Sequence, residues 1–148
     1  MKKDRRMKTV LVIDDKASEI ARAVEAAKAL GWEVLTCDAS FREEEGYSNN
    51  TEWIRMIPKV DGVVTDLMWN HDNHGEKTMG LLVVIEALSK GKPVVVCTNA
   101  REFDRGHHGE AMGFINDGYY TSSDRKAFGL VETKDWNYAM KKLSERFQ

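Results

Sequence analysis

The sequence predicts an α/β domain with a doubly wound, five-stranded parallel sheet that carries helices on both faces. Two features lead to this prediction. Five short apolar runs, rich in β-branched residues, alternate along the chain with segments of helical periodicity. The run Thr9–Ile13 is continuous and β-branched, which is typical of parallel strands that are buried on both faces. Strands that alternate with helices require right-handed crossovers, and these place helices on both sides of the sheet.

The composition is that of one soluble globular domain. The chain has 148 residues, of which 42% are hydrophobic and 31% charged, and a formal net charge of −2. A chain of this length can bury roughly 70% of the surface that its unfolded state exposes, which is enough for a core without disulfides or a structural metal. The near-neutral charge excludes the broadly basic face of a nucleic-acid binder, so we expect no nucleic-acid partner.

The N-terminal segment predicts neither a targeting signal nor a membrane span. A basic tail at 1–8 precedes the first apolar run, and we expect the folded domain to occupy 9–148. That run has only five residues, too few for a signal peptide or a membrane helix. We therefore expect a cytoplasmic protein with no membrane partner. Cys37 and Cys97 lie in or at the end of apolar runs, which favours buried, reduced thiols.

The first predicted strand is Thr9–Ile13, and it stops abruptly at Asp14 and Asp15. Residues 16–31 then predict a helix of about four turns. Gly31 stands where a helix commonly ends in the left-handed conformation. The predicted apolar face of this helix comprises Ile20, Val24, Ala27 and Leu30.

The second predicted strand is Trp32–Cys37, and a polar, partly acidic connection follows it at 38–50. Residues 51–57 predict a short helix. We expect it to end before Pro58, because proline disfavours the helical conformation in the residue that precedes it.

The third predicted strand is Gly62–Thr65, which ends on Asp66. A loop at 68–79 follows and is polar apart from Trp69, whose indole either covers the pocket next to Asp66 or packs within the loop. The next helix closes at Gly91. Its predicted apolar positions are Leu81, Leu82, Ile85 and Leu88.

The last two predicted strands are Pro93–Cys97 and Phe128–Glu132, separated by a long segment with a weak pattern. Asp135 can cap a final helix, because an aspartate at this position accepts a hydrogen bond from the first turn. The predicted apolar face of that helix comprises Trp136, Ala139, Met140, Leu143 and Phe147.

Polar side chains follow four of the five predicted strands. Asp14 and Asp15 follow the first, Asp66 the third, Thr98 the fourth and Lys134 the fifth. In doubly wound sheets the ligand site lies beyond the carboxyl ends of the strands, so we expect these residues to lie together.

Carboxylates crowded at such an edge repel one another, by about 4 kcal/mol per pair at ~4 Å and an effective dielectric near 20. A hard cation such as Mg²⁺, with Mn²⁺ as a substitute, suits an all-oxygen site and would compensate, together with Lys134. A metal beside an exposed aspartate, with a lysine and a hydroxyl nearby, is what phosphoryl transfer to a carboxylate requires.

Four segments of the sequence resemble the receiver domain of response regulators in two-component signalling, and the resemblance covers most of the chain. They are VLVIDD at 10–15, VVTDLMW around Asp66, PVVVCT ending at Thr98, and TK at 133–134. The resemblance implies a flavodoxin-like sheet with strand order 2-1-3-4-5, and a receiver-like domain over 9–148.

The resemblance also implies roles for individual residues. Asp66 would be the phosphoacceptor, and Asp14 and Asp15 the acidic pair that binds Mg²⁺ with Asp66 and the backbone carbonyl of Met68. Thr98 would supply the hydroxyl that moves toward the phosphoryl group, and Lys134 the ammonium that pairs with it.

The chain departs from the family pattern at four positions. Asn99 replaces the usual small residue after the threonine, and Asp135 replaces the proline after the lysine. Val131 stands where an aromatic switch residue precedes the lysine, and Asn70 where a proline follows the phosphoacceptor. The loops after Asp66 and Thr98 are also enlarged. This chain therefore retains the residues of the family's site, whereas the surface through which the family signals to a partner is altered.

Four histidines lie in two loops that follow neighbouring predicted strands. His71 and His74 follow the third strand, and His107 and His108 the fourth. They form either a second site for zinc or another transition metal, or a gate over the Asp66 pocket, or they are ordinary surface histidines.

The main functional hypothesis is a single-domain receiver that accepts a phosphoryl group on Asp66 from a phosphohistidine donor in a Mg²⁺-dependent reaction. The donor would be a histidine kinase or a histidine phosphotransfer protein, and output would go through another, unidentified protein. We expect no enzymatic activity beyond self-catalysed phosphoryl transfer and hydrolysis at Asp66. Two alternatives stay open: an unphosphorylated receiver-like adaptor that binds proteins, and a metal-dependent phosphohydrolase.

Overall fold

The computed structural model describes residues 7–40, 51–70, 76–99 and 127–147. The strands are β1 (Thr9–Asp14), β2 (Glu33–Asp38), β3 (Gly62–Thr65), β4 (Trp69–Asn70), β5 (Glu76–Lys77), β6 (Val94–Cys97) and β7 (Phe128–Val131). The helices are α1 (Ala17–Ala29), α2 (Trp53–Met56), the 3-10 helix η3 (Ile57–Lys59), α3 (Met79–Ser89) and α7 (Trp136–Arg146). No helix within these ranges is long and apolar enough to cross a membrane.

The main sheet has five strands in the order β2-β1-β3-β6-β7, and every pair in it is parallel. Numbered along the chain as the five predicted strands, this is the order 2-1-3-4-5. The predicted fold class is therefore confirmed. The short strands β4 and β5 form a separate antiparallel pair in a region that the sequence predicted to be loop.

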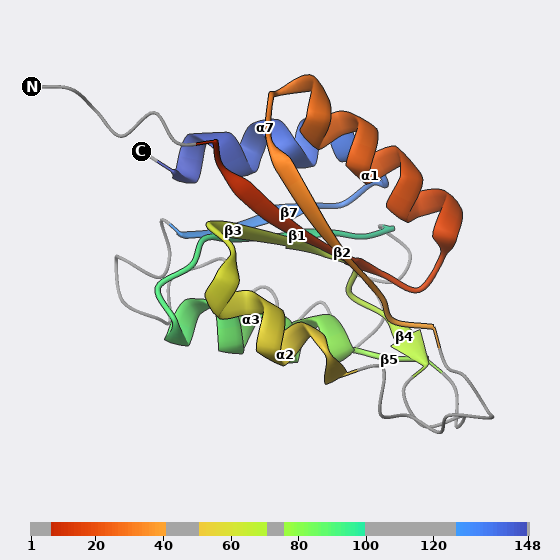
Figure 1. Ribbon diagram of the computed structural model, residues 1–148. Coiled ribbons are helices and arrows are strands. Elements are labelled where there is room, and N and C mark those ends of the chain that lie inside the picture. Colours follow the sequence, from red (N-terminus) through yellow and green to blue (C-terminus); the bar gives the residue numbers. More distant parts are fainter. Residues whose placement is uncertain (1–6, 41–50, 71–75, 100–126, 148) are drawn as a thin grey trace, which may run out of the picture.

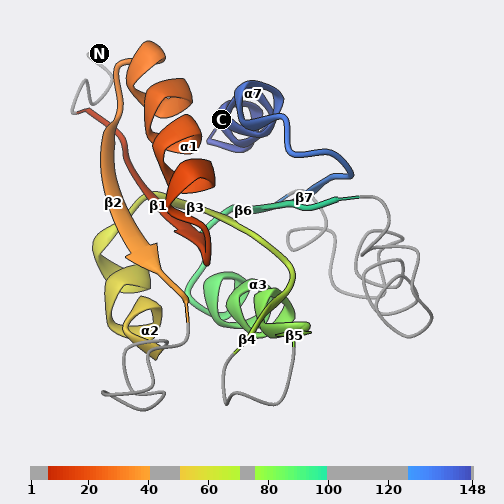
Figure 2. The same cartoon turned by 90° about the vertical axis from the view of Figure 1, so that its right-hand side faces the viewer.

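Helices cover both faces of this sheet (Figure 1; Figure 2). Helices α1 and α7 lie on one face, and α2 and α3 on the other. Alternate residues of β1 supply the two cores: Val10 and Val12 pack with α1 and α7, and Leu11 and Ile13 pack on the opposite side. This alternation follows from the period of two in a strand, and it explains why the strand is apolar throughout.

The buried face of α1 matches the predicted one only in part, because Ala27 is buried as predicted while Ile20 and Val24 are half-buried. Its buried residues are Ala23, Ala26 and Ala27, and Leu30 at the C-cap is 46% exposed. Small side chains let α1 approach both the sheet and α7, so the larger apolar residues flank the contact instead of filling it. Gly31 has a φ of +79°, which confirms the predicted left-handed helix end.

Helix α3 also differs from its predicted orientation. Its buried residues are Gly80, Val83, Val84 and Ala87, whereas Leu82 and Ile85 are 49% and 46% exposed. Nearly every side chain of this helix is apolar, so the spacing of leucine and isoleucine alone does not identify the buried face.

Two further segments agree with the predictions. Helix α2 ends at Met56, before Pro58 as predicted, and the chain continues as the 3-10 helix η3, which accepts the proline in its first turn. Asp135 caps α7 as predicted, and its carboxylate accepts a hydrogen bond from the backbone N–H of Tyr138 at 3.0 Å. The buried residues of α7 are Trp136, Ala139, Met140 and Leu143, as the sequence predicted.

Candidate functional site

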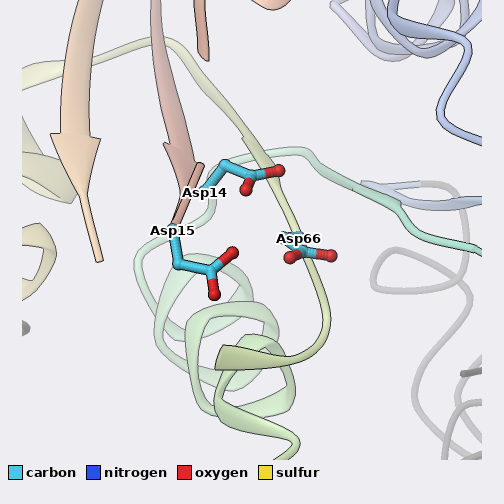
Figure 3. A group of neighbouring side chains, drawn as sticks. All are labelled: Asp14, Asp15 and Asp66. Atoms are coloured by element: carbon cyan, nitrogen blue, oxygen red, sulfur yellow. The ribbon is translucent and has the colours of Figure 1, made fainter. Parts of the chain in front are cut away.

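Three carboxylates meet at the carboxyl edge of the main sheet. Asp14 is the last residue of β1, Asp15 follows it, and Asp66 directly follows β3, which pairs with β1. Each of the three offers a carboxylate oxygen, and these oxygens lie within 4.8 Å of one another. Figure 3 shows the three side chains together beyond the ends of the two strands. Asp14 and Asp66 are buried, and Asp15 is partly exposed.

Backbone groups hold the two buried carboxylates in place. The N–H of Lys16 donates to Oδ1 of Asp14 at 2.9 Å, and the N–H of Leu67 donates to Oδ1 of Asp66 at 2.8 Å. The N–H of Asp66 donates to the carbonyl of Ile13 at 2.8 Å, which ties the start of the loop to β1. Charge-assisted bonds of this kind fix the side chains and offset part of the cost of burying them.

Lys134 reaches the same site from the far end of the chain. Its Nζ lies 2.8 Å from Oδ2 of Asp14 and 2.9 Å from Oδ1 of Asp66. Burial alone would lower the pKa of Lys134, but the charges of Asp66 and Asp14, and the hydrogen bonds to both, raise this pKa above its ordinary value. Three carboxylates face one ammonium, so these four groups together carry an excess of negative charge.

The side chain of Lys134 also contacts the first residue of α7. Its Nζ lies 5.2 Å from the centroid of the Trp136 ring, within the range of a cation–π contact. The indole Nε1 of Trp136 donates a 2.8 Å hydrogen bond to Oε1 of Glu19 in the first turn of α1. A surface depression of about 550 Å³ between α1 and α7 is partly lined by Lys134 and Arg22.

Thr98 lies at the same edge of the sheet. It directly follows β6, the strand next to β3, it is fully buried, and its N–H donates to the carbonyl of Val131 at 2.9 Å. The preceding residue, Cys97, donates from Sγ to the carbonyl of Thr133 at 3.3 Å. Burial raises the pKa of the Cys97 thiol to about 12, against the opposing charge of Lys134. The thiol is therefore a neutral packing group.

Gly80 brings the start of α3 against the backbone of the acidic site. A Cβ at this position would overlap the carbonyl oxygen of Asp66 and lie 2.7 Å from Cα of Leu67. The N–H of Gly80 donates to the carbonyl of Leu67 at 2.9 Å. Only a residue without a side chain permits this approach.

The structure brings together Asp14, Asp15, Asp66 and Lys134, and it places Thr98 at the same edge. The side chain of Met68 is 6% exposed and belongs to the core under α2 and α3. Trp69 is fully buried in that same core, so of its two predicted placements the packed one holds. His71, His74, His107 and His108 lie outside the described residues.

The donor set fits a hard divalent cation. All the ligands on offer are oxygens, as Mg²⁺ and Mn²⁺ prefer, and a dication would balance the excess negative charge of the cluster. Asp14, Asp15 and Asp66 are the residues that could hold it, with the carbonyl of Met68 as a further candidate.

Sequence reasoning missed three contributors to this site. They are Glu19, Trp136 as a neighbour of Lys134, and Gly80 as the contact of Asp66. Each of these contacts depends on how a helix is placed against the sheet. The only local signals were a glutamate in the first turn after Asp14 and Asp15, and a tryptophan two residues after Lys134.

Several solved structures have a fold similar to that of this chain. The signal receiver domain of a Luxo repressor protein from Vibrio parahaemolyticus superposes with a TM-score of 0.58 at 14% identity, covering 96% of this chain and 91% of that chain. A response regulator receiver domain protein from Clostridium thermocellum superposes with a TM-score of 0.55 at 16% identity, covering 95% and 94%. Chemotaxis response regulator CheY4 of Vibrio cholerae also gives 0.55 at 16% identity, covering 95% and 99%.

A search of protein-family models gives no match, and a search of curated proteins gives no significant match. The likeness therefore lies in the three-dimensional structure. The strand order and the helices on both faces of the sheet are those of the receiver-type α/β fold. The chain has the fold of response-regulator receiver domains, as the resemblance of its sequence motifs predicted.

Proposed function

We propose that the chain is a receiver that accepts a phosphoryl group on Asp66 in a Mg²⁺-dependent reaction. The observation that carries this proposal is the position of Lys134, whose Nζ bridges Asp14 and Asp66 at 2.8 and 2.9 Å beside Asp15. A carboxylate nucleophile, an acidic pair and a fixed ammonium at one sheet edge are the parts that phosphoryl transfer to an aspartate needs.

In this reaction Asp66 is the nucleophile. One of its carboxylate oxygens forms a bond to phosphorus while the P–N bond of a phosphohistidine donor breaks, and the electron pair leaves with the imidazole nitrogen, which is then protonated. Mg²⁺ held by Asp14, Asp15, Asp66 and the Met68 carbonyl would neutralise charge on the phosphoryl oxygens.

Lys134 and Thr98 act on the phosphoryl group during its transfer and afterwards. The ammonium of Lys134, already beside Oδ1 of Asp66, would pair with one phosphoryl oxygen. The hydroxyl of Thr98, at the end of the strand next to β3, would donate to another. Phosphorylation would thus draw in the ends of β6 and β7 and change the surface that another protein reads.

The partners follow from this chemistry. The donor would be a histidine kinase or a histidine phosphotransfer protein, and the output another protein in the cytoplasm. Neither nucleic acid nor membrane is needed for the reaction.

The direct test is incubation with Mg²⁺ and a small acyl phosphate, read by intact mass. We expect the wild-type chain to gain the mass of one phosphoryl group, and neither D66N nor wild type with excess EDTA to gain it. E33Q removes a carboxylate at the start of β2, at the edge of the sheet opposite to the site, and should react like wild type. A wild-type chain that stays unmodified, or a D66N variant that is modified equally, contradicts the proposal.

One observation favours the adaptor as a second candidate. Val131, at the position of the family's aromatic switch, is 3% exposed and packs in the core with α1 and α7, so it cannot swing as an aromatic side chain would. If the chain is an adaptor, D66N should bind its partner as tightly as wild type does, and acyl phosphate should not change that affinity. The phosphohydrolase alternative stays a prediction, which lack of turnover on generic phosphate esters would remove.

A further inference from the structure

Lys134 needs something to hold it in place. It lies in the short connection between β7, which ends at Val131, and α7, which begins at Trp136. Its side chain has four rotatable bonds, and 21% of its surface is exposed, so solvent competes with Asp14 and Asp66 for the ammonium. The two carboxylates attract Nζ but do not fix the path of the aliphatic stem.

Trp136 is placed to fix it. The indole is 3% exposed, and its ring centroid is 5.2 Å from Nζ of Lys134. A ring face favours a cation, and tryptophan favours it most among the aromatic side chains. The ammonium is therefore bounded by two carboxylates and one aromatic ring.

Glu19 fixes the ring in turn. Its Oε1 accepts the 2.8 Å hydrogen bond from Nε1 of Trp136, and its side chain is only 17% exposed. Its other oxygen, Oε2, lies 3.9 Å from NH1 of Arg22. Glu19 sits on α1, which packs directly against α7, so the bond joins two neighbouring elements far apart in sequence.

We propose that Trp136 and Glu19 are positioning residues for Lys134. Trp136 keeps the ammonium between Asp14 and Asp66, and Glu19 keeps the indole facing the ammonium. This inference rests on the proposed function, in which Lys134 pairs with the phosphoryl group, and it adds that the first turn of α1 controls how well that lysine is presented. A purely structural role would make Trp136 only a packing residue between α1 and α7.

Four variants separate the two roles. E19A removes the acceptor of the indole hydrogen bond, and E19Q retains an acceptor oxygen without the charge. W136F keeps an aromatic ring but removes the N–H and weakens the attraction for a cation. E25A is the control, because Glu25 is an exposed glutamate of the same helix.

The first measurement needs no phosphorylation. In protein labelled with ¹³C and ¹⁵N lysine, the ε-methylene and ammonium signals of Lys134, assigned by their loss in K134M, should be displaced by the ring of Trp136. We expect E19A and W136F to move these signals toward those of a free lysine, and E19Q and E25A to leave them in place. Signals that stay at the wild-type position in both E19A and W136F overturn the proposal.

The second measurement is the rate at which Asp66 is modified by a small acyl phosphate with saturating Mg²⁺. We expect a fall of about fivefold in E19A and W136F, because both variants weaken the cation–π contact, and a wild-type rate in E19Q. An equal fall of this rate in E19Q and E19A would contradict the positioning role of the hydrogen bond between Trp136 and Glu19. If E19A does not fold, W136F and E19Q decide the matter. If wild type is never modified, the proposed function fails, while the lysine signals still judge the positioning.

Discussion

The ammonium of Lys134 lies 2.8 Å from Oδ2 of Asp14, a fully buried carboxylate 120 residues earlier in the chain. The contact joins the end of the first strand to the connection that follows the last strand of the sheet. Lys134 is therefore both a candidate participant in chemistry and a structural counter-charge. The two roles can be measured separately, because the second needs neither metal nor phosphodonor.

Replacing Lys134 with methionine should destabilise the metal-free protein. Removal of one partner of a buried ion pair leaves the other charge uncompensated, and we expect the free energy of unfolding to fall by about 3 kcal/mol. Urea denaturation in EDTA measures it. K59M, at an exposed lysine of η3, should stay within about 0.5 kcal/mol of wild type. Equal losses in the two variants would show that Lys134 has no special structural role.

Magnesium should stabilise the fold through the acidic cluster. At ten times its Kd, Mg²⁺ should raise the free energy of unfolding by about 1.4 kcal/mol, because a ligand that binds only the folded state shifts the equilibrium by mass action. The thermal midpoint at increasing Mg²⁺ concentration measures this. D15N, which alters the partly exposed member of the cluster, should lose most of the effect, and E33Q should keep it. Stabilisation of D15N equal to that of wild type would place the ion elsewhere.

The contact at Gly80 predicts a large effect from a single methyl group. The Cβ of G80A would collide with backbone atoms of Asp66 and Leu67, which cannot rotate away, and we expect a loss of about 3 kcal/mol. In G62A the nearest atom is Cζ of the Phe147 ring at 2.9 Å, and that side chain can shift. Chemical denaturation should therefore show a smaller loss in G62A, and the reverse order would contradict the described packing.

The orientation of α3 can be tested by two substitutions on its different faces. L82Q replaces an exposed side chain and should change the free energy of unfolding by no more than about 0.5 kcal/mol. V84A removes buried methyl groups and should cost about 2 kcal/mol. A larger loss for L82Q than for V84A would mean that the helix presents its leucines to the core.

Stability should fall at alkaline pH because of the buried thiols. Burial raises the pKa of Cys37 to about 11 and that of Cys97 to about 12, from 9.0 for a free thiol. Above pH 9 the unfolded chain therefore binds fewer protons than the folded chain, and the free energy of unfolding decreases with pH. This stabilisation is complete below pH 9 and is lost as the pH rises through the folded values. Denaturation at pH 7 and pH 10 measures the fall, which should be smaller in the C37A/C97A double variant.

The sequence was sufficient for the sheet and for the strand-end residues. A strand buried on both faces is largely apolar, so Thr9–Ile13 and Gly62–Thr65 were recognisable, and the polar residues after them marked the edge that carries the site. The helix faces were not recognisable in the same way. Helix α1 buries alanines and α3 is apolar on nearly all sides, so periodicity identified the buried face of each helix only in part.

The neighbours of Lys134 could not be predicted for a different reason. The bond between Trp136 and Glu19 crosses from α7 to α1, and it exists only because both helices pack on the same face of the sheet. No local pattern records which residue of one helix meets which residue of another. The carboxylate cluster was accessible to prediction because parallel strands all end at one edge.

Helix α3 begins against the peptide that joins Asp66 to Leu67. Gly80 makes this contact with its backbone, and no side chain lies between the two segments. We infer that any displacement of this peptide is transmitted to α3 as movement of a rigid rod. Leu82 and Ile85 on its outer surface would move with it. A change at the buried carboxylate of Asp66 would then alter the outer surface of the molecule. The methyl resonances of Leu82 and Ile85 would report this change.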